Sequence, residues 1–550
     1  MKRPLSLCLS LAALFWTEAA AMASTAEKPN IIYILADDWG VGDVKTYGGD
    51  SCKIDTPHMD RLAEKGMKFT DAHSPSSVCT PTRYSILTGR YNWRSSLKSG
   101  VLRGFSKPLL EPGRETVASM LKKNGYTTIA IGKWHLGMDF PTTDGNEVDE
   151  KGKNTDWKGQ IQNGPTAVGF DKYWGISASL DMPPYIWIEN DRFVGECTTQ
   201  KSFHPRRMGP AHSDFEDIDV LPKLTERTVA TISEQSKSGQ PFFIYMPLNS
   251  PHCPIVPSKP FQGKSSLGAY GDFVMETDWA VGQVVEAVER AGIADNTLII
   301  VTADNGCSHA PSKRKQDNGR IKFLMGKKSP DDPEAHYPSD IYRGHKADIY
   351  EGGHRVPFIA RWDGKVKPGS VSAEPVCQVD LFATCAEIVG AKPDDSTAED
   401  SVSILPALLG TATKPLRKAV VHHSIDGSFA IRQGKWKLAL CPGSGGWSHP
   451  SPPSGKKKAP PQEPIKDWVQ LFDLESDPAE TRNLASKHPK IVASLTALVQ
   501  KYNAAHLVKM WQDNGGRLKL FPKEGADHHP HGLPDPAPLI AAIAAEAASP

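Results

Sequence analysis

Short apolar runs that each end in a polar loop organise most of the chain. Four of them, rich in β-branched and aromatic residues, are Asn30–Leu35, Thr127–Ile131, Phe242–Met246 and Thr297–Thr302. Because these runs are continuous rather than alternating, we expect strands buried on both faces, as in parallel sheets covered by helices. Between the third and fourth runs, Asp272–Ala291 carries apolar residues at helical spacing and ends at Gly292. The pattern predicts an α/β fold: a large, mostly parallel sheet flanked by helices on both faces.

The pattern changes after Pro415. Short runs typical of antiparallel strands are Ala419–His423, Phe429–Gln433, Trp436–Cys441 and Gln470–Leu474, and Lys487–His506 has the spacing of an amphipathic helix. The intervening Pro442–Pro464 is rich in proline, serine, glycine and lysine, which predicts an exposed loop. We therefore predict a large unit at residues 24–415, a smaller α+β unit at 416–510 with an antiparallel sheet and one long helix, and an extended tail at 511–550.

The first 23 residues have the order of a signal peptide. Lys2 and Arg3 precede the apolar run Leu5–Trp16, and Ala21-Met22-Ala23 offers a small-residue cleavage pattern. The run is too short to span a bilayer, and no later stretch reaches membrane length without charges. We expect an exported protein, periplasmic or extracellular, with no membrane span.

Composition excludes some classes of protein. Lysine and arginine total 64 against 63 acidic residues, and a formal charge of +1 argues against a nucleic-acid partner. Hydrophobic residues make up 39% of the chain, enough for a real core, while 46 glycines and 45 prolines indicate many loops. The nine cysteines include no Cys-x-x-Cys pair, which disfavours zinc-ribbon and thioredoxin-type sites and leaves any disulfide pairing open.

Oxygen donors follow the first and fourth apolar runs. Asp37-Asp38 comes directly after one predicted strand, and Asp304-Asn305 directly after another. Either pair alone is most often a helix cap or a turn. Two pairs at the ends of two core strands favour one shared Ca²⁺ or Mg²⁺ site, because hard cations prefer oxygen ligands and open α/β sheets bind ligands at this edge.

A third motif is the segment Cys79–Arg90, CTPTRYSILTGR. Pro81 suits the first turn of a helix and Gly89 its end. Cys79 and Arg83 are four residues apart and so lie on one side of that helix. A group at Cys79 would sense the positive end of the helix dipole and free amide donors, a natural anion site. The alternative is a buried cysteine beside a surface arginine.

The same string resembles the signature of the formylglycine-dependent type I sulfatases, arylsulfatase-like members of the alkaline phosphatase-like superfamily. Further segments resemble that family's motifs in its order, namely NIIYILADDWG, IGKWHLG, SPHCP, TADNG and GHKADIYEGGHRVP. The resemblance extends from about residue 28 to about residue 510. It implies a sulfuric ester hydrolase with the α/β fold predicted above.

The resemblance also implies roles for particular residues. A calcium ion, with magnesium as the other candidate, would be bound by Asp37, Asp38, Cys79, Asp304 and Asn305. Cys79 would be oxidised to formylglycine (3-oxoalanine) and act as the nucleophile, held by Arg83. Lys133, His252 and Lys346 would contact the substrate, with His252 as the acid for the leaving alcohol and His135 as the base. His345, where relatives often have glycine, would contact the substrate beside the sulfate.

The predicted activity is hydrolysis of an aryl or carbohydrate sulfate monoester by an exported enzyme. The expected partners are the sulfate ester, as a small molecule or a glycan, and a formylglycine-generating maturation enzyme. Two alternatives stay open. One is a phosphonate monoester or phosphodiester hydrolase of the same superfamily, and the other is a catalytically silent carbohydrate-binding relative.

Overall fold

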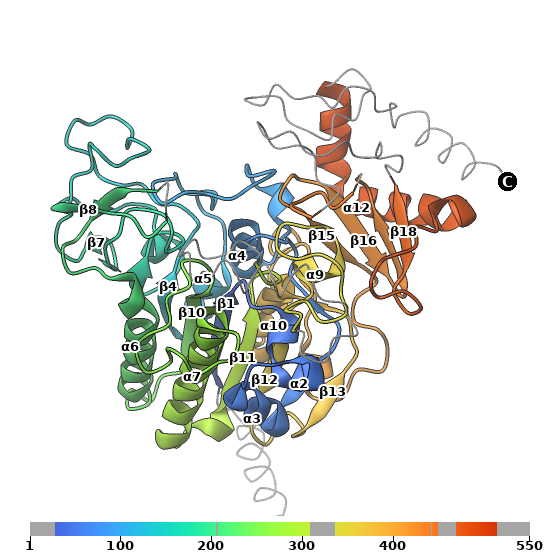
Figure 1. The fold of residues 1–550 in the computed structure, drawn as a ribbon, viewed down its shortest axis with the longest axis horizontal. Coiled ribbons are helices and arrows are strands. Elements are labelled where there is room, and N and C mark those ends of the chain that lie inside the picture. The colour runs from blue at the N-terminus through green and yellow to red at the C-terminus, as the bar shows by residue number, and fades with distance from the viewer. Residues whose placement is uncertain (1–27, 205–206, 309–335, 442, 449–468, 514–550) are drawn as a thin grey trace, which may run out of the picture.

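A ten-stranded sheet forms the centre of the molecule in the computed structural model, which describes residues 28–204, 207–308, 336–441, 443–448 and 469–513 (Figure 1). In sheet order the strands are β13 (Ser370–Ser372), β2 (Met67–Phe69), β12 (Phe358–Arg361), β11 (Thr297–Ala303), β1 (Asn30–Asp37), β10 (Phe242–Pro251), β4 (Thr127–Lys133), β5 (Lys172–Ile176), β6 (Ile188–Glu189) and β7 (Arg192–Phe193). The four strands predicted from the apolar runs are β1, β4, β10 and β11, and they are neighbours in the middle of the sheet.

Five central strands, from β11 to β5, are parallel. β1 lies between β11 and β10, with Ile31 opposite both Leu298 and Phe243, and every residue of β1 is buried. Antiparallel pairs occur outside this parallel block, where β12 pairs with β11 and β2, and β6 pairs with β5 and β7. The mostly parallel sheet predicted from continuous apolar runs is confirmed.

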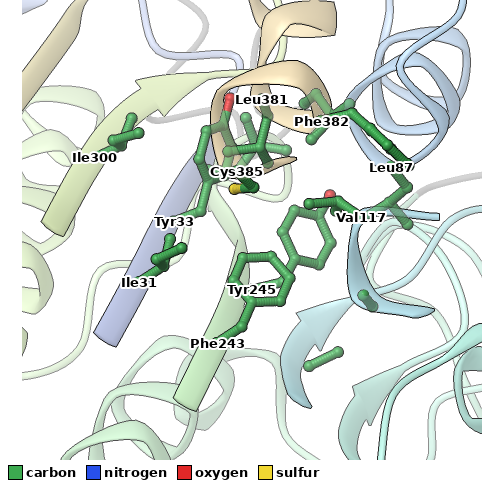
Figure 2. Packing of buried hydrophobic residues seen from close by; sticks show 14 of the residues in the cluster. Ile31, Tyr33, Leu87, Val117, Phe243, Tyr245, Ile300, Leu381, Phe382 and Cys385 are labelled. Atoms are coloured by element: carbon green, nitrogen blue, oxygen red, sulfur yellow. The ribbon is translucent and has the colours of Figure 1, made fainter. Parts of the chain in front are cut away.

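Each face of the sheet packs against its own group of helices. Ile31 and Tyr33 of β1 belong to a core that includes Leu87, Val117 and Phe382 from helices on one face (Figure 2). Alternate residues of the same strand enter a second core with helices on the other face, because successive side chains of a strand point in opposite directions. The helices are α4 (Cys79–Thr88), α5 (Val117–Lys123) and α10 (Leu381–Val389) on the first face, and α3 (Pro57–Lys65), α6 (Val220–Gln235) and α7 (Ala269–Arg290) on the second.

A four-stranded antiparallel sheet follows the large one, as predicted (Figure 1, orange to red). Its strands are β15 (Val420–His423), β16 (Phe429–Gln433), β17 (Trp436–Ala439) and β18 (Gln470–Asp473), in that order. Helix α12 (Pro489–Asp513) covers it through Val492 and Leu495, which share a core with Ile431 and Leu438. We call the segment from β15 through α12 the C-terminal unit. It contacts the chain just before α4 directly, since the N–H of Ser77 donates to the carbonyl of His423 at 2.9 Å.

Several short elements complete the description. They are α2 (Lys45–Gly48), α9 (Glu351–His354), α11 (Leu405–Leu408), β3 (Ala72–His73), β14 (Val376–Cys377), β8 (Thr199–Lys201) and β9 (Gly209–Ala211). Within the described ranges, no helix combines the length and apolar character needed to cross a membrane. The signal peptide predicted at residues 1–23 lies outside the described residues, as do residues 514–550 of the predicted tail.

Candidate active site

Helix α4 begins at Cys79 and is buried along its whole length. Its first residues leave backbone N–H groups without partners inside the helix, which favours an anion at this end. Gly89 ends the helix with φ of 67°, and a Cβ there would lie 2.8 Å from the Cβ of Phe382, so conformation and space both require glycine. Burial raises the pKa of the Cys79 thiol, which is therefore protonated rather than a thiolate nucleophile at neutral pH.

Three carboxylates gather at the carboxyl ends of β1 and β11. Asp37 is the last residue of β1, Asp38 follows it with φ of 65°, and Asp304 follows β11; all three are at most 1% exposed. Asp37, Asp304 and Cys79 each offer a ligand atom within 4.8 Å of the others. Asn305 lies beside them and donates through Nδ2 to Asp38 Oδ1 at 2.7 Å. The residues predicted to bind a metal are thus brought together.

Unpartnered oxygens show that this group fits a hard cation. Asp37 Oδ1 and the Asn305 side-chain carbonyl are buried and have no hydrogen-bond partner among the described residues. A buried acceptor without a partner is costly, and a carboxylate even more so. A cation coordinated by carboxylate and amide oxygens would satisfy both atoms, and this donor set suits Ca²⁺ or Mg²⁺.

Three permanent cations face these carboxylates. Arg83 donates to Asp304 Oδ2 through Nε at 3.1 Å and Nη2 at 2.7 Å. Lys133 Nζ lies 2.5 Å from Asp37 Oδ2, and Lys346 Nζ lies 2.7 Å from Asp38 Oδ1. Three positive and three negative groups cancel formally. A bound divalent ion would leave an excess of positive charge, which would favour the entry of an anionic substrate into this buried site.

The same charges shift the carboxyl pKa values in opposite directions. Burial raises the pKa of Asp37, but Lys133, His252 and Arg83 outweigh burial and hold it well below its ordinary value. Burial and the negative charge of Asp37 raise the pKa of Asp304 to about 7. Carboxylates this close compete for ionisation, and a divalent cation between them would favour the charged form of each.

The two histidines present different ring nitrogens to the site. His135 donates from Nε2 to the carbonyl of Leu102 at 2.8 Å, so its Nδ1 keeps a lone pair, and this buried atom has no partner among the described residues. Burial, Lys133 and Arg83 lower the pKa of His135 well below its ordinary value, which keeps the ring neutral. His252 donates from Nδ1 to the carbonyl of Cys253 at 2.5 Å, and its Nε2 lies 3.6 Å from Asp38 Oδ2.

His345 lies next to Lys346 in sequence but makes its contacts elsewhere. Its Nδ1 lies 3.0 Å from the backbone carbonyl of Lys346, and its Nε2 lies 3.1 Å from Ser448 Oγ in the C-terminal unit. The other predicted site residues converge around Cys79 and the three carboxylates, whereas the ring of His345 is engaged with the chain beside them.

Two polar residues near this site were not singled out from the sequence. Ser179 Oγ accepts a hydrogen bond from Lys133 Nζ at 2.8 Å and lies 3.5 Å from both ring nitrogens of His252. Asn249 is 1% exposed, and neither atom of its amide has a partner among the described residues. Ser179 carries no sequence signal, but Asn249 stands at the end of an apolar run, three residues before His252, where an amide is unexpected.

A second buried polar group joins β3 and α9 to the C-terminal unit. Asp71, His73 and His354 form a chain of contacts, with Nε2 of His73 2.7 Å from Asp71 Oδ1 and the two Nδ1 atoms 3.1 Å apart. Lys437 Nζ closes the chain, 3.0 Å from His354 Nε2. The same ring nitrogens have further neighbours, since His354 Nε2 lies 3.2 Å from the carbonyl of Ile349 and His73 Nε2 lies 3.1 Å from Arg432 Nη1. His422 stacks on His354 with ring centroids 3.6 Å apart.

This histidine group predicts a measurable dependence of stability on pH. Burial, together with the neighbouring His73 and Lys437, lowers the pKa of His422 well below its ordinary value. The unfolded chain therefore binds a proton below pH about 6.5 that the folded chain does not, and this residue costs about 1.4 kcal/mol of stability per pH unit below that value. We expect His422→Phe to lose less stability than wild type between pH 7 and pH 5, measured by urea unfolding. Equal losses in the two proteins would contradict this assignment.

Comparison with known proteins places this geometry in a family. Residues 29–391 match the sulfatase family model. The chain is 33% identical to the N-acetylgalactosamine-6-O-sulfatase of Bacteroides thetaiotaomicron, with 86% of this chain and 93% of the relative covered. It is also 33% identical to bovine arylsulfatase A, over 85% of this chain and 86% of the relative.

A solved structure is also similar to this chain. It comes from work on the metabolism of multiple glycosaminoglycans by B. thetaiotaomicron, and it superimposes with a TM-score of 0.72 at 31% identity, covering 86% of this chain and 99% of that one. The resemblance found in the sequence motifs is therefore confirmed. The chain belongs to the sulfatase family and is a hydrolase of sulfuric esters.

Proposed function

We propose that the protein hydrolyses a carbohydrate sulfate monoester to the alcohol and inorganic sulfate, after export, with a formylglycine derived from Cys79 and a bound Ca²⁺. The observation that carries the proposal is the convergence of Cys79, Asp37 and Asp304 within 4.8 Å, with Arg83 bonded to one of the carboxylates. The names of the relatives support a carbohydrate sulfate, since one acts on N-acetylgalactosamine-6-O-sulfate and a similar structure comes from work on glycosaminoglycans.

The metal would be held by Asp37, Asp38, Asp304, Asn305 and the modified Cys79. It would supply positive charge to the sulfate oxygens, on which negative charge has to be stabilised during the reaction. Two of the proposed ligands, Asp37 and Asn305, keep unpartnered buried oxygens for it. Lys133 and Lys346 now contact carboxylates. With the ion bound, both ammonium groups would be available to the sulfate oxygens.

Modification of Cys79 is part of the proposal because the thiol is a poor candidate for the nucleophile. It is protonated in its buried position, and a thiol that attacked sulfur would end in a stable covalent product. As a hydrated aldehyde, formylglycine supplies two hydroxyls on one carbon, one to attack sulfur and one whose deprotonation releases sulfate. Arg83, one helical turn further along α4, would hold that group in place.

The two histidines then have separate tasks. His135 is a neutral ring with a free lone pair on Nδ1, which is what a general base requires. His252 presents Nε2, because its Nδ1 proton is fixed on the Cys253 carbonyl. A protonated Nε2 would donate to the leaving alcohol. Ser179 lies within 3.5 Å of His252 and bonds to Lys133. We therefore propose that Ser179 orients both side chains.

A substrate panel tests the proposed reaction. The protein is produced together with a formylglycine-generating enzyme and offered N-acetylgalactosamine 6-sulfate, an aryl sulfate and an aryl phosphonate monoester. We expect release of inorganic sulfate, with the sugar sulfate turned over with the highest kcat/KM. Preference for the phosphonate ester would favour the phosphonate hydrolase alternative. Aldehyde at Cys79 without turnover of any ester would favour the silent carbohydrate-binding relative.

A further inference from the structure

The loop that carries Lys346 is held in place by the C-terminal unit. The N–H of Ile349 donates to the carbonyl of Ser444 at 2.7 Å, and the N–H of Ile425 donates to the carbonyl of Ala347 at 3.1 Å. The loop is also bonded to the segment after β11, where the N–H of Lys346 donates to the carbonyl of Cys307 at 2.8 Å. A residue proposed to contact the sulfate is therefore followed by two residues with hydrogen bonds to partners 78 and 95 positions later in the chain.

Asp348 contributes most to this attachment. Its carboxylate is fully buried, and Oδ1 accepts from the N–H groups of Trp447 at 2.8 Å and Ser448 at 3.0 Å. Its Oδ2 accepts from the N–H of His345 at 3.0 Å and from the hydroxyl of Ser448. One carboxylate thus joins the residue before Lys346 to the segment 444–448. Hydrogen bonds to a charged acceptor are stronger than neutral ones, so this junction is stiff.

Close backbone contact makes the junction specific. A Cβ on Gly446 would lie 2.3 Å from the carbonyl oxygen of Ala347 and 2.6 Å from Asp348 Oδ1, so only glycine allows the two segments to approach this closely. Ala347 itself has φ of 80°, a conformation unfavourable for a residue with a side chain. Such a conformation persists only where the surroundings impose it. Here the bonds from Ile425 to the Ala347 carbonyl and from Ala347 to Ser77 do so.

The strained residue directly follows Lys346, whose side chain is 5% exposed and reaches Asp38. The direction of the Lys346 side chain therefore depends on this conformation and on the bonds of Asp348 and segment 444–448, which fix His345 and Ile349 on either side of it. We propose that Asp348 is a positioning residue, which aims the Lys346 ammonium at the sulfate by locking its loop to the C-terminal unit. This inference rests on the sulfate-binding role of Lys346 in the proposed function.

A double-mutant cycle on the matured enzyme tests the coupling. Asp348→Asn keeps the shape of the side chain but removes its charge. Its amide NH₂ would also face the backbone N–H groups that now donate to the carboxylate. Because a displacement of about 1 Å at a reacting centre costs about 100-fold, we expect kcat/KM for a sulfate ester to fall roughly 10- to 100-fold. Lys346→Ala is also expected to be impaired. If Asp348 acts through Lys346, the double variant loses no more than Lys346→Ala alone.

The matched control is Asp477→Asn. Asp477 also accepts backbone hydrogen bonds, from Thr481 at 2.9 Å and Arg482 at 2.8 Å, but these lie within its own loop in the C-terminal unit. We expect near wild-type kcat/KM from this variant despite a comparable loss of thermal stability. Should Asp348→Asn not fold, Gly446→Ala is the second variant. It separates the same two segments and should show the same non-additivity with Lys346→Ala.

The possible results distinguish a failure of the positioning role of Asp348 from a failure of the sulfate-binding role of Lys346. Multiplicative losses in the double variant, or wild-type activity of Asp348→Asn beside an impaired Lys346→Ala, would overturn the positioning role alone. Full activity of Lys346→Ala would overturn the sulfate-binding role of Lys346, and with it the inference.

Discussion

Cys79→Ala is expected to lose at least about 10⁴-fold in kcat on a sulfate ester while the protein stays folded. The proposed formylglycine cannot form on alanine, and loss of a nucleophile in enzymes of this kind costs several orders of magnitude. Removal of one buried sulfur atom should lower the free energy of unfolding by only about 1 to 2 kcal/mol. Release of inorganic sulfate and the thermal midpoint would be measured on the same preparation.

A second buried cysteine supplies the control for this prediction. Cys385 belongs to α10 and is fully buried in the core beside Tyr33 (Figure 2), and it is not part of the group that Cys79 forms with Asp37 and Asp304. Cys385→Ala should lose stability to a similar extent and keep the activity of wild type. Substantial turnover by Cys79→Ala would rule out the proposed nucleophile, whatever the behaviour of the control.

Removal of the metal is expected to reduce turnover roughly 10³-fold while leaving the fold intact. Without the ion, Arg83, Lys133 and Lys346 neutralise the three carboxylates, so the buried charges stay balanced. Activity falls because the excess positive charge at the sulfate oxygens is lost, a stabilisation worth several kcal/mol in buried sites. A chelator should abolish sulfate release, and added Ca²⁺ should restore it.

The thermal midpoint gives a readout of the metal that is independent of activity. A ligand present at 100 times its Kd stabilises the folded protein by about 2.7 kcal/mol, so Ca²⁺ should raise the midpoint of the chelated protein. Asp304→Asn removes a proposed ligand and should lose this rise. Asp278→Asn is the control, since this buried carboxylate accepts from the N–H groups of His58 and Met59 at the start of α3, outside the site. A calcium-dependent rise that persists in Asp304→Asn would contradict the proposed ligand set.

The central part of the fold could be predicted because its signal is local. Continuous apolar runs give β1, β4, β10 and β11, and the polar residues that end them fall on one edge of the sheet because the strands are parallel. The outer strands β6 and β7 have two residues each and show no periodicity, so their existence depends on pairing with β5. No local sequence pattern predicts such pairing between strands.

The active site was likewise predictable only where the signal is local in the sequence. Motif positions brought Cys79, the carboxylates and the cationic residues to notice. The structure adds that Arg83, Lys133 and Lys346 each pair with a carboxylate, so the formal charges cancel before any ion binds. The contacts of Ser179 and Asp348 join segments 46 and 99 positions apart. Such long-range contacts depend on the folded chain and cannot be recognised from the spacing of residues along the sequence.

The hydrogen bond between Ser77 and His423 has a consequence for synthesis of the protein. These residues are separated by 346 positions, so this hydrogen bond cannot form until β15 has left the ribosome. Long-range pairings form late in folding. Once they form, Cys79 is 2% exposed and closed to another enzyme. If Cys79 is oxidised as proposed, the chain itself sets a time limit on that step, and a slower maturation enzyme would leave a folded protein with an unmodified thiol.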